Sequence, residues 1–505
     1  MKKNLTAISV SLFVMFVAGS SCTKNMQENP TLANTEKLSA SATTTLATID
    51  TATITLNWTT TYQRIDGFGS FAGRATPFFE SPKRDSIMQQ IWGADGLQLN
   101  MIRGEVLYTY PFDKPSGAVT IKPAGSSVDM DVNSAAYQAL TSDQKAQIAQ
   151  LWIFKKVKER YQVPIMFAST WTPPLYMKTN TSSVSGQNFN GLNYSCCSTD
   201  FANYVAGFTK AYQDEGINFY GVSPSNEPEN VFSSWASSYW TAAHLGQFIT
   251  NNLRPALNAK GLTSTRIISS ENAAWGTANT FLSSMDKSNV DILAGHGYVE
   301  IGDLILGKRG LNPNPVTWNY ATGNKPVWMT EACDDSGVYD GTMVGGLKLA
   351  VNMHQFLAVC NVNAYVYWLG MLAFNNNESL IGANADGSLV YPKTFDVMGQ
   401  FTRFVHAGYY RFNAGLANNS TLKVSAYKDP ATGKFSVVVI NPGSNETHCR
   451  LNLSGFTAGA ISSYLTADNS STHWQQGSAA APQGNGSYVL TVPPSSVITF
   501  TGIAN

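Results

Sequence analysis

The segment INFYGVSPSNEP, residues 217–228, changes character where its apolar part ends. The run around Val222 is typical of a strand buried on both faces, and the polar pair Asn226 and Glu227 follows almost at once. In a parallel sheet such residues lie at the carboxyl edge, where α/β proteins carry their binding and catalytic groups. Pro228 lacks an N–H and fixes its own φ, so it stiffens the turn.

Seven further segments repeat this apolar pattern and alternate with stretches of helical spacing. They are RIDGFGSFA (64–72), QLNMIRGEV (98–106), VPIMFAST (163–170), TRIISSEN (265–272), VDILAGHGY (290–298), KPVWMTEA (325–332) and NAYVYWLG (363–370). Helices are predicted over 143–161, 242–257 and 346–361. Thr141 and Gln144 form a capping box for the first helix, and Pro255 is expected to kink the second. Eight strand–helix units in a row predict an α/β protein with a closed parallel sheet, a (β/α)8 TIM barrel.

The C-terminal part has a different period. From about residue 410, short alternating strands are separated by Gly, Asn, Ser and Pro, which predicts an all-β sandwich. TATITLNW (51–58) alternates in the same way and is expected to add a strand to that sandwich. The expected organisation is a signal peptide (1–22), a flexible linker (23–48), a sandwich strand (49–62), a catalytic barrel (63–408) with a polar insertion (107–140), and the β-sandwich domain (409–505).

The N-terminus predicts export. Lys2 and Lys3 precede an apolar stretch over 8–17 that is too short to span a bilayer, and small residues lead to Cys22. This pattern resembles a bacterial lipoprotein signal with lipidation at Cys22. We therefore expect a cell-surface or outer-membrane lipoprotein that meets the membrane only through its N-terminal lipid. An ordinary secretory signal, giving a secreted or periplasmic protein, is the alternative.

Composition and cysteine spacing exclude several classes of partner. The 505-residue chain has zero formal net charge, which argues against nucleic acid. Only 13% of residues are charged while 11% are aromatic, a balance that suits a neutral polar ligand such as a sugar. No C-x-x-C spacing occurs, so a structural zinc site is not expected. Backbone strain is expected to keep the adjacent Cys196 and Cys197 from bonding to each other.

Four glutamates directly follow predicted barrel strands: Glu105, Glu227, Glu271 and Glu331. Glu227 ends the fourth strand and Glu331 the seventh, so they face each other across an eight-stranded ring. Two opposed carboxyl groups suit hydrolysis of a glycosidic bond, because one protonates the departing oxygen while the other attacks the anomeric carbon or activates water. Glu105 and Glu271 are expected to be bystanders or supports.

Other residues are predicted to hold a sugar at the same mouth. Arg103 is expected to pair with Glu331 and keep it ionised as a nucleophile, whereas Glu227 must begin protonated. The amide of Asn226 is expected to meet a sugar hydroxyl. The expected substrate-binding set is Arg103, Trp171, Tyr176, Asn226, Trp235, His296, Tyr298 and Trp368. With six His in all and no H-x-H pair, neither a metal nor a cofactor is expected.

The motifs taken together resemble glycoside hydrolase family 30 from about residue 50 to the C-terminus. They are RIDGFGS, FASTWTPPLYM, GINFYGVSPSNEPE, VDILAGHGY, KPVWMTEA, AYVYW, LKVSAYK and PPSSVITF. The resemblance implies a retaining enzyme of the clan whose acid/base follows strand four, here Glu227, and whose nucleophile follows strand seven, here Glu331.

Within that family the chain looks most like the bacterial xylanase branch, which includes glucuronoxylan-specific enzymes. Those enzymes carry an arginine after the strand-eight tryptophan, but YWLGMLAFNNN (367–377) contains neither Arg nor Lys. The resemblance therefore implies an endo-β-1,4-xylanase acting on xylan or decorated xylan, without dependence on a glucuronyl branch. The alternatives are another family 30 β-glycosidase of the β-1,6-glucanase, β-glucosidase or β-fucosidase type, or a non-catalytic glycan-binding surface lipoprotein.

Overall fold

The computed structural model describes residues 50–505 apart from 74, 186–188, 232, 320–321, 335–340, 374–376 and 385. The predicted signal peptide (1–22), its Cys22 and the linker (23–48) lie outside the described residues. Within the described part of the chain, no helix combines the length and the apolar character that crossing a bilayer requires.

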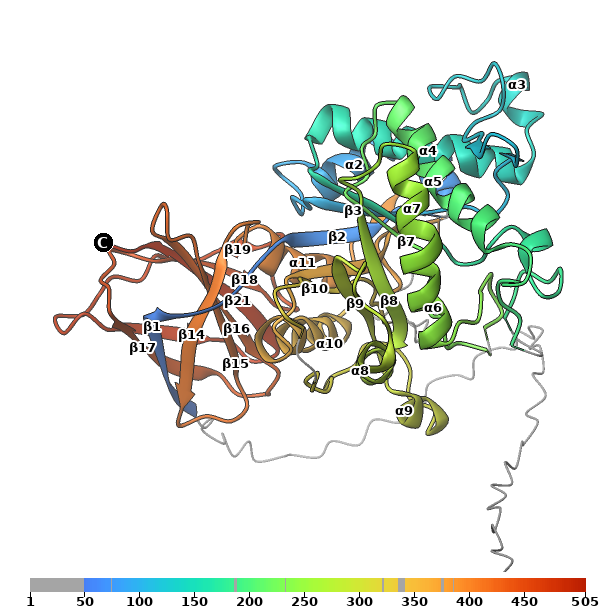
Figure 1. Cartoon of the computed structure of the whole chain (residues 1–505). Coiled ribbons are helices and arrows are strands. Elements are labelled where there is room, and N and C mark those ends of the chain that lie inside the picture. The colour runs from blue at the N-terminus through green and yellow to red at the C-terminus, as the bar shows by residue number, and fades with distance from the viewer. Residues whose placement is uncertain are drawn as a thin grey trace, which may run out of the picture. The chain divides into compact units, whose positions relative to one another are not determined.

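Eight parallel strands close into a barrel, as the sequence predicts (Figure 1). Strands that are consecutive in the chain are neighbours in the ring. The seventh strand pairs with the eighth, and the eighth pairs with the first, so the ring is closed. The strands are β2 (Gly67–Phe71), β3 (Met101–Glu105), β6 (Ile165–Ser169), β7 (Gly221–Ser223), β8 (Arg266–Ala274), β9 (Ile292–Tyr298), β10 (Val327–Met329) and β11 (Ala364–Leu372). A hairpin of β12 (Ser379–Ala383) and β13 (Leu389–Val390) extends the sheet beside β11.

Helices follow each strand. They are α1 (Thr76–Glu80), α2 (Arg84–Trp92), α3 (Ala135–Gln138), α4 (Ser142–Tyr161), α5 (Ser198–Asp214), α6 (Ala242–Phe248), α7 (Arg254–Ala259), α8 (Trp275–Ser284), α9 (Ile301–Ile305), α10 (Met343–His354) and α11 (Lys393–Thr402). The predicted capping box is present, since Gln144 N donates to Thr141 Oγ1 and Thr141 N donates to Gln144 Oε1. The insertion after β3 holds the short pair β4 (Phe112–Asp113) and β5 (Ala118–Val119).

Two predicted helices change their winding near their ends. A π-helical turn η2 (Ile249–Leu253) separates α6 from α7, and Pro255 stands in the first turn of α7. Proline has no N–H and its ring crowds the carbonyl four residues back, so the regular bonding pattern cannot pass through it. The helix that begins at α10 also ends in a π-helical turn, η3 (Gln355–Val359).

The C-terminal strands form one nine-stranded mixed sheet that curls over its own core, the sandwich predicted from the sequence. Its order is β19-β18-β21-β16-β15-β14-β1-β17-β20. The strands are β1 (Asp50–Arg64), β14 (Tyr410–Ala417), β15 (Lys423–Lys428), β16 (Lys434–Asn441), β17 (Thr447–Ser454), β18 (Ser462–Thr466), β19 (Gln475–Gln476), β20 (Tyr488–Val492) and β21 (Ser496–Ile503).

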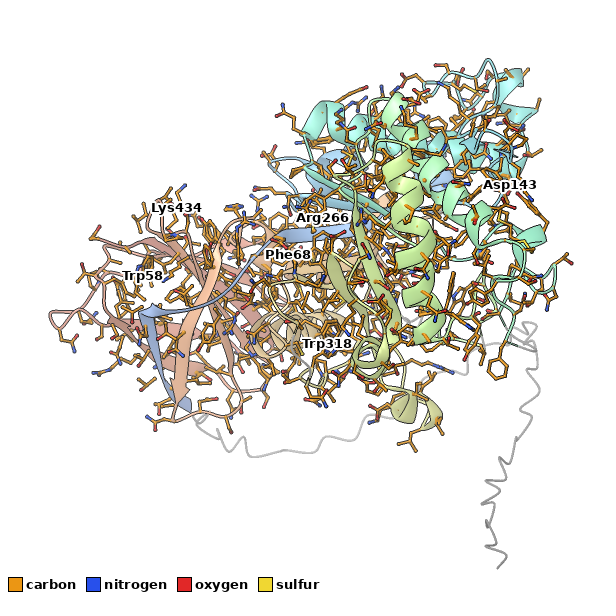
Figure 2. The ribbon with its side chains drawn as sticks, in the orientation of Figure 1. Trp58, Phe68, Asp143, Arg266, Trp318 and Lys434 are labelled. Carbon is orange, nitrogen blue, oxygen red and sulfur yellow. A yellow bond between two sulfur atoms is a disulfide. The ribbon has the colours of Figure 1, made fainter. Side chains whose placement is uncertain are left out.

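The N-terminal strand belongs to this sheet, as expected. β1 pairs antiparallel with β14 and parallel with β17. Trp58, which Figure 2 labels on this sheet, lies edge-on to Phe412 and Phe435. Helix α11 joins sheet and barrel, because Gln400 donates to Thr466 and accepts from Thr499. The sandwich therefore holds the barrel at both ends of its chain.

Candidate active site

The carboxyl ends of the barrel strands bring the predicted polar residues together. Arg103 lies within β3, Glu271 within β8 and His296 within β9, whereas Glu227 follows β7 by four residues and Glu331 follows β10 by two. All five are buried. Buried charges need partners, and the contacts among these residues supply them. We call these five residues the mouth cluster.

Two of the glutamates have an unusual backbone. Glu227 has φ +48° and Glu271 has φ +64°, in the left-handed region that residues with a side chain rarely adopt. The two loops are joined there, since Glu227 N donates to Glu271 O at 2.8 Å. Such conformations cost about 1–3 kcal/mol each and persist where surrounding contacts hold them, which is common at active sites.

Arg103 is fully buried and binds four oxygen acceptors. Its Nη1 pairs with Glu331, Nη2 donates to Glu271 at 2.5 Å and to Asn226 Oδ1 at 2.6 Å, and Nε donates to Ser169 at 3.1 Å. The predicted pair with Glu331 is therefore present. The bond to Oδ1 of Asn226 fixes the amide so that Nδ2 can donate to a ligand.

His296 lies between three carboxylates. Nδ1 is 3.3 Å from Glu227 and 3.8 Å from Glu331, and Nε2 is 3.3 Å from Glu271. Burial alone would lower the pKa of His296, but the charge of Glu331 and the hydrogen bonds to Glu227 and Glu271 outweigh it and raise the pKa to about 9. His296 is therefore an imidazolium at neutral pH. Tyr298 completes the surroundings of Glu331, because its hydroxyl donates to Oε1 at 2.9 Å.

Glu271 is the most deeply buried glutamate of the mouth cluster. It has no exposed surface and is enclosed by Arg103, His296 and Ser169. Burial opposes ionisation, but Arg103 and His296 overcome it and lower the pKa of Glu271. The backbone N–H and C=O of Glu105 are bound by the side chain of Gln150.

The charges of the mouth cluster leave room for one proton. With Glu227, Glu271 and Glu331 ionised against Arg103 and His296, the cluster carries one excess negative charge, and one proton makes it neutral. Arg103 touches Glu271 and Glu331 directly, and its bonds do not include Glu227. Carboxyl oxygens of Glu227 and Glu331 lie within 4.8 Å of each other. The arrangement can therefore offer an acid and a nucleophile to a single bond.

The donor set does not suit a metal ion. Glu227, His296 and Glu331 bring ligand atoms within 4.8 Å of one another, a spacing that an ion could use. However, both ring nitrogens of His296 face carboxylates, and an imidazolium has no lone pair to give a metal. Glu331 is already neutralised by Arg103. The cluster is better suited to moving protons.

The predicted aromatic residues divide into two groups. Trp171 and Trp368 are buried beside the mouth cluster, where Arg103 lies 4.8 Å over the Trp171 ring and Phe71 stacks on Trp368 at 4.5 Å. Tyr176 and Trp235 instead stand exposed in the loops after β6 and β7. Spacing along the chain could not separate these groups, because exposure depends on how the loops fold.

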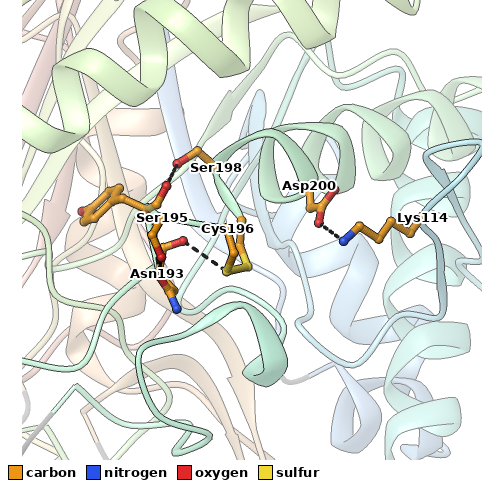
Figure 3. Close-up of a disulfide and its surroundings, with 8 residues drawn as sticks. Lys114, Asn193, Ser195, Cys196, Ser198 and Asp200 are labelled. Atoms are coloured by element: carbon orange, nitrogen blue, oxygen red, sulfur yellow. Dashed lines mark hydrogen bonds and ion pairs between the residues drawn. A yellow bond between two sulfur atoms is a disulfide. The ribbon is translucent and has the colours of Figure 1, made fainter.

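The prediction that Cys196 and Cys197 do not bond is wrong. They form a disulfide directly before α5, in a turn where both backbone N–H groups donate to Asn193 O (Figure 3). The expectation rested on backbone strain between adjacent cysteines, whereas the turn brings the two side chains together.

Glu229 was missed by sequence reasoning, although the motif NEPE displays it. Its carboxylate accepts from Asn272 Nδ2 and Ala273 N, both at 2.9 Å, and so ties the β7 loop to β8. Burial is the main cause that raises the pKa of Glu229 to about 7. The sequence signal for Glu229 was its position two residues after Glu227.

The chain is similar to several proteins that are named as glycan-cleaving enzymes. Over 343 residues the chain is 25% identical to the glucuronoxylanase XynC of Bacillus subtilis, covering 66% of this chain and 73% of that protein. It is 33% identical over 97 residues to an endo-1,6-β-D-glucanase of Neurospora crassa, covering 19% of this chain and 20% of that one. Xylanase C of Talaromyces cellulolyticus shares the fold, with a TM-score of 0.71 and 23% identity over 89% of this chain and 99% of that catalytic domain.

The family assignment rests on a separate match, to the family itself. Residues 58–343, more than half of the chain, match the glycosyl hydrolase family 30 TIM-barrel domain. The chain therefore belongs to glycosyl hydrolase family 30 and is a glycoside hydrolase.

Proposed function

We propose that the protein is a retaining endo-β-1,4-xylanase in which Glu331 is the nucleophile and Glu227 the acid/base. The observation that carries the mechanism is the close approach of the two carboxyl groups, within 4.8 Å. Retaining glycosidases hold theirs about 5–5.5 Å apart, whereas inverting enzymes leave roughly 6.5–9.5 Å for a water. The spacing supports direct attack by one carboxylate.

The surroundings of each carboxyl support its role. Glu331 pairs with Arg103 and receives a hydrogen bond from Tyr298. Arg103 pairs with Glu271 and Glu331, and the proposed mechanism assigns the transferred proton to Glu227. A protonated Glu227 is the form that a general acid needs.

Two displacements complete the reaction. Glu331 attacks the anomeric carbon while the bond to the leaving sugar breaks and Glu227 gives that oxygen its proton. A water then attacks the same carbon, Glu227 takes the water's proton, and the bond to Glu331 breaks, so the configuration is retained. Asn226 Nδ2 donates to the hydroxyl beside the reacting carbon, an interaction that strengthens as charge develops.

The choice of xylan rests on similarity. The matched bacterial relative is called a glucuronoxylanase, and the aligned fungal structure a xylanase. The stretch 367–377 offers no cationic side chain for a glucuronyl branch, so undecorated xylan is expected to be cleaved as well as glucuronoxylan. A β-1,6-glucanase is the second candidate, favoured by the higher local identity to the Neurospora crassa enzyme.

Product analysis tests substrate and mechanism separately. The protein is incubated with linear xylan, glucuronoxylan, arabinoxylan and β-1,6-glucan, and product sizes are measured. Cleavage of the glucan alone would contradict the xylanase assignment and leave the family unchanged. Glu331→Gln is expected to abolish hydrolysis, and proton NMR of the first product should show the β-anomer. Unchanged hydrolysis in Glu331→Gln would contradict the mechanism and would favour a non-catalytic role for Glu227 and Glu331.

Export as a lipoprotein anchored through Cys22 remains part of the proposal. The disulfide between Cys196 and Cys197 supports export, because disulfides persist outside the reducing cytosol. Replacing Cys22 by Ala is expected to release the protein from the membrane fraction, and retention there would contradict the lipid anchor.

A further inference from the structure

Strand β8 is longer than its neighbour β7, and the loop after β7 lies along the part that extends further. β7 ends at Ser223, and its last pair with β8 joins Val222 to Ile267. β8 continues to Ala274. Backbone N–H and C=O groups along a strand edge need hydrogen-bond partners. On the side of β7, the residues of β8 beyond Ile267 therefore depend on the loop for these partners.

The first two of these hydrogen bonds reach β8 before Glu227 and at Glu227 itself. Ser225 Oγ donates to Ser270 O at 3.0 Å, and Glu227 N donates to Glu271 O at 2.8 Å. Glu227 and Glu271 are the two glutamates with left-handed φ. Because such a backbone is unfavourable for a residue with a side chain, it persists only where the surrounding contacts hold it.

The side chain of Glu229 makes the next connection to β8, on the other side of Glu227. Its Oε1 accepts from Ala273 N and its Oε2 accepts from Asn272 Nδ2, both at 2.9 Å. A carboxylate has two acceptor oxygens, so one side chain can bind two donors at once. Hydrogen bonds to a carboxylate are also stronger than those between neutral groups. Glu227 is thus bound to β8 from both directions along the chain.

Glu227 and Glu229 belong to one tight turn. Asn230 N donates to Glu227 O at 2.9 Å and closes the turn, with Pro228 and Glu229 at its centre. Proline suits the second position of such a turn because its φ is already fixed. Asn230 Nδ2 also donates to the carboxyl of Glu227, to Oε2 at 3.0 Å. A shift of Glu229 would therefore move the turn and, through Asn230, the carboxyl of Glu227.

The carboxyl of Glu227 is held differently from those of Glu271 and Glu331. Arg103 binds both of these glutamates directly. The carboxyl of Glu227 instead receives a hydrogen bond from its own turn and lies 3.3 Å from His296 Nδ1. A general acid must lie within hydrogen-bond reach of the oxygen that it protonates, and a misplacement of about 1 Å can lower a rate about 100-fold.

We propose that Glu229 is a positioning residue, whose bonds to Asn272 and Ala273 hold the Glu227 turn on β8 and so aim the acid/base at the glycosidic oxygen. This inference rests on the proposed role of Glu227. Glu229 acts through Glu227, so its loss should slow the steps in which Glu227 gives or takes a proton. A step that needs no proton from Glu227 should keep its rate.

Two substrates that differ in their need for an acid test the proposal. Cleavage of xylan requires a proton on the departing sugar, whereas a dinitrophenyl β-xylobioside releases a stable phenolate without one. Glu229→Gln keeps the shape of the side chain but replaces one acceptor oxygen by an NH2 donor, so one of the two bonds is lost. We expect kcat/KM to fall about 10-fold on xylan and to stay within about twofold on the dinitrophenyl substrate.

A second variant and a matched control complete the test. Asn272→Ala removes one donor and leaves the charge of Glu229 in place, so it should lower the xylan-to-aryl ratio of kcat/KM as well. Glu300 is the matched control, because its carboxylate also joins two loops, accepting from Gly276 N at 2.9 Å and from Asn312 Nδ2 at 3.2 Å. Glu300→Gln should leave the xylan-to-aryl ratio unchanged.

Two results would overturn the proposal. An equal loss on both substrates would show that Glu229 supports the site as a whole, and full activity on both would show that Glu227 is held without it. If Glu229→Gln does not fold, the ratio in Asn272→Ala decides.

Failure of the proposed function gives a different result. Glu227→Ala would then lose kcat/KM equally on both substrates, because Glu227 would not be the acid/base. If the wild-type protein cleaves only β-1,6-glucan, the xylanase assignment fails, and the same ratio is measured with that glucan and a dinitrophenyl β-glucoside.

Discussion

Replacing Arg103 by Lys tests whether the geometry of the guanidinium, rather than its charge, organises the mouth cluster. Arg103 makes four hydrogen bonds from three nitrogens, and two of them reach the uncharged acceptors Asn226 and Ser169. A lysine keeps the charge but has one nitrogen and cannot span these directions. Losing the two bonds to uncharged acceptors at about 1 kcal/mol each removes about 2 kcal/mol. If this loss falls on the transition state, kcat/KM drops roughly 30-fold.

Removing the charge altogether is expected to be more damaging. Arg103→Met leaves Glu271 and Glu331 buried without the guanidinium that they share, and breaking a buried ion pair in this way typically costs about 3–5 kcal/mol of unfolding free energy. The assays are urea denaturation and kcat/KM on a chromogenic substrate that the wild-type protein cleaves.

A matched variant separates this effect from the general cost of changing arginine. Arg84 lies 4.8 Å over the Trp152 ring, away from the mouth cluster, so Arg84→Lys should leave kcat/KM unchanged. A folded Arg103→Lys variant with kcat/KM within about twofold of wild type would refute the argument from geometry.

Four other predictions concern titration and the disulfide. The pKa of His296 is raised to about 9, so the stability that its charge contributes is complete below about pH 6.5 and is lost as pH rises through 9. The fall in Tm over that pH range should disappear in His296→Gln. Burial, with Lys423 and Arg411 adding to it, lowers the pKa of His354 to about 4, so stability should fall as pH drops from 6.5 through 4, and His354→Leu should flatten that part of the Tm curve. The raised pKa of Glu229, about 7, predicts stability that is complete below about pH 4.5 and is lost as pH rises through 7; a Glu229→Gln variant with the same slope would contradict it. Reducing the Cys196–Cys197 disulfide should leave aryl-substrate turnover unchanged, because the bond lies in the loop before α5; a parallel loss of activity would show that the loop shapes the mouth cluster.

The barrel and its two opposed glutamates could be predicted because they depend on local pattern. Eight apolar runs are enough to define a closed parallel sheet, and the rule that chemistry lies at the carboxyl ends selects Glu227 and Glu331. Of the four partners of Arg103, the sequence suggested only Glu331. The others require the register of β3 against β6 and the path of the β7 loop, which are tertiary properties.

Features that depend on backbone detail were not accessible from the sequence. The Cys196–Cys197 bond requires a turn rather than an extended chain, and spacing carries no information about that choice. Tyr176 and Trp235 were expected with Trp171 at the mouth, but burial of a ring in a long loop is decided by neighbouring loops. Glu271 lies inside β8 and not after it, so its enclosure could not be seen from its position alone.

The role of Glu271 follows from counting charge around it. Arg103 and His296 both face Glu271, at 2.5 and 3.3 Å. Glu271→Gln removes that charge, so the two cations lose one of the carboxylates that balance them inside the barrel, where unbalanced charge is costly. The variant should therefore lower kcat/KM even though Glu271 has no exposed surface through which it could contact substrate.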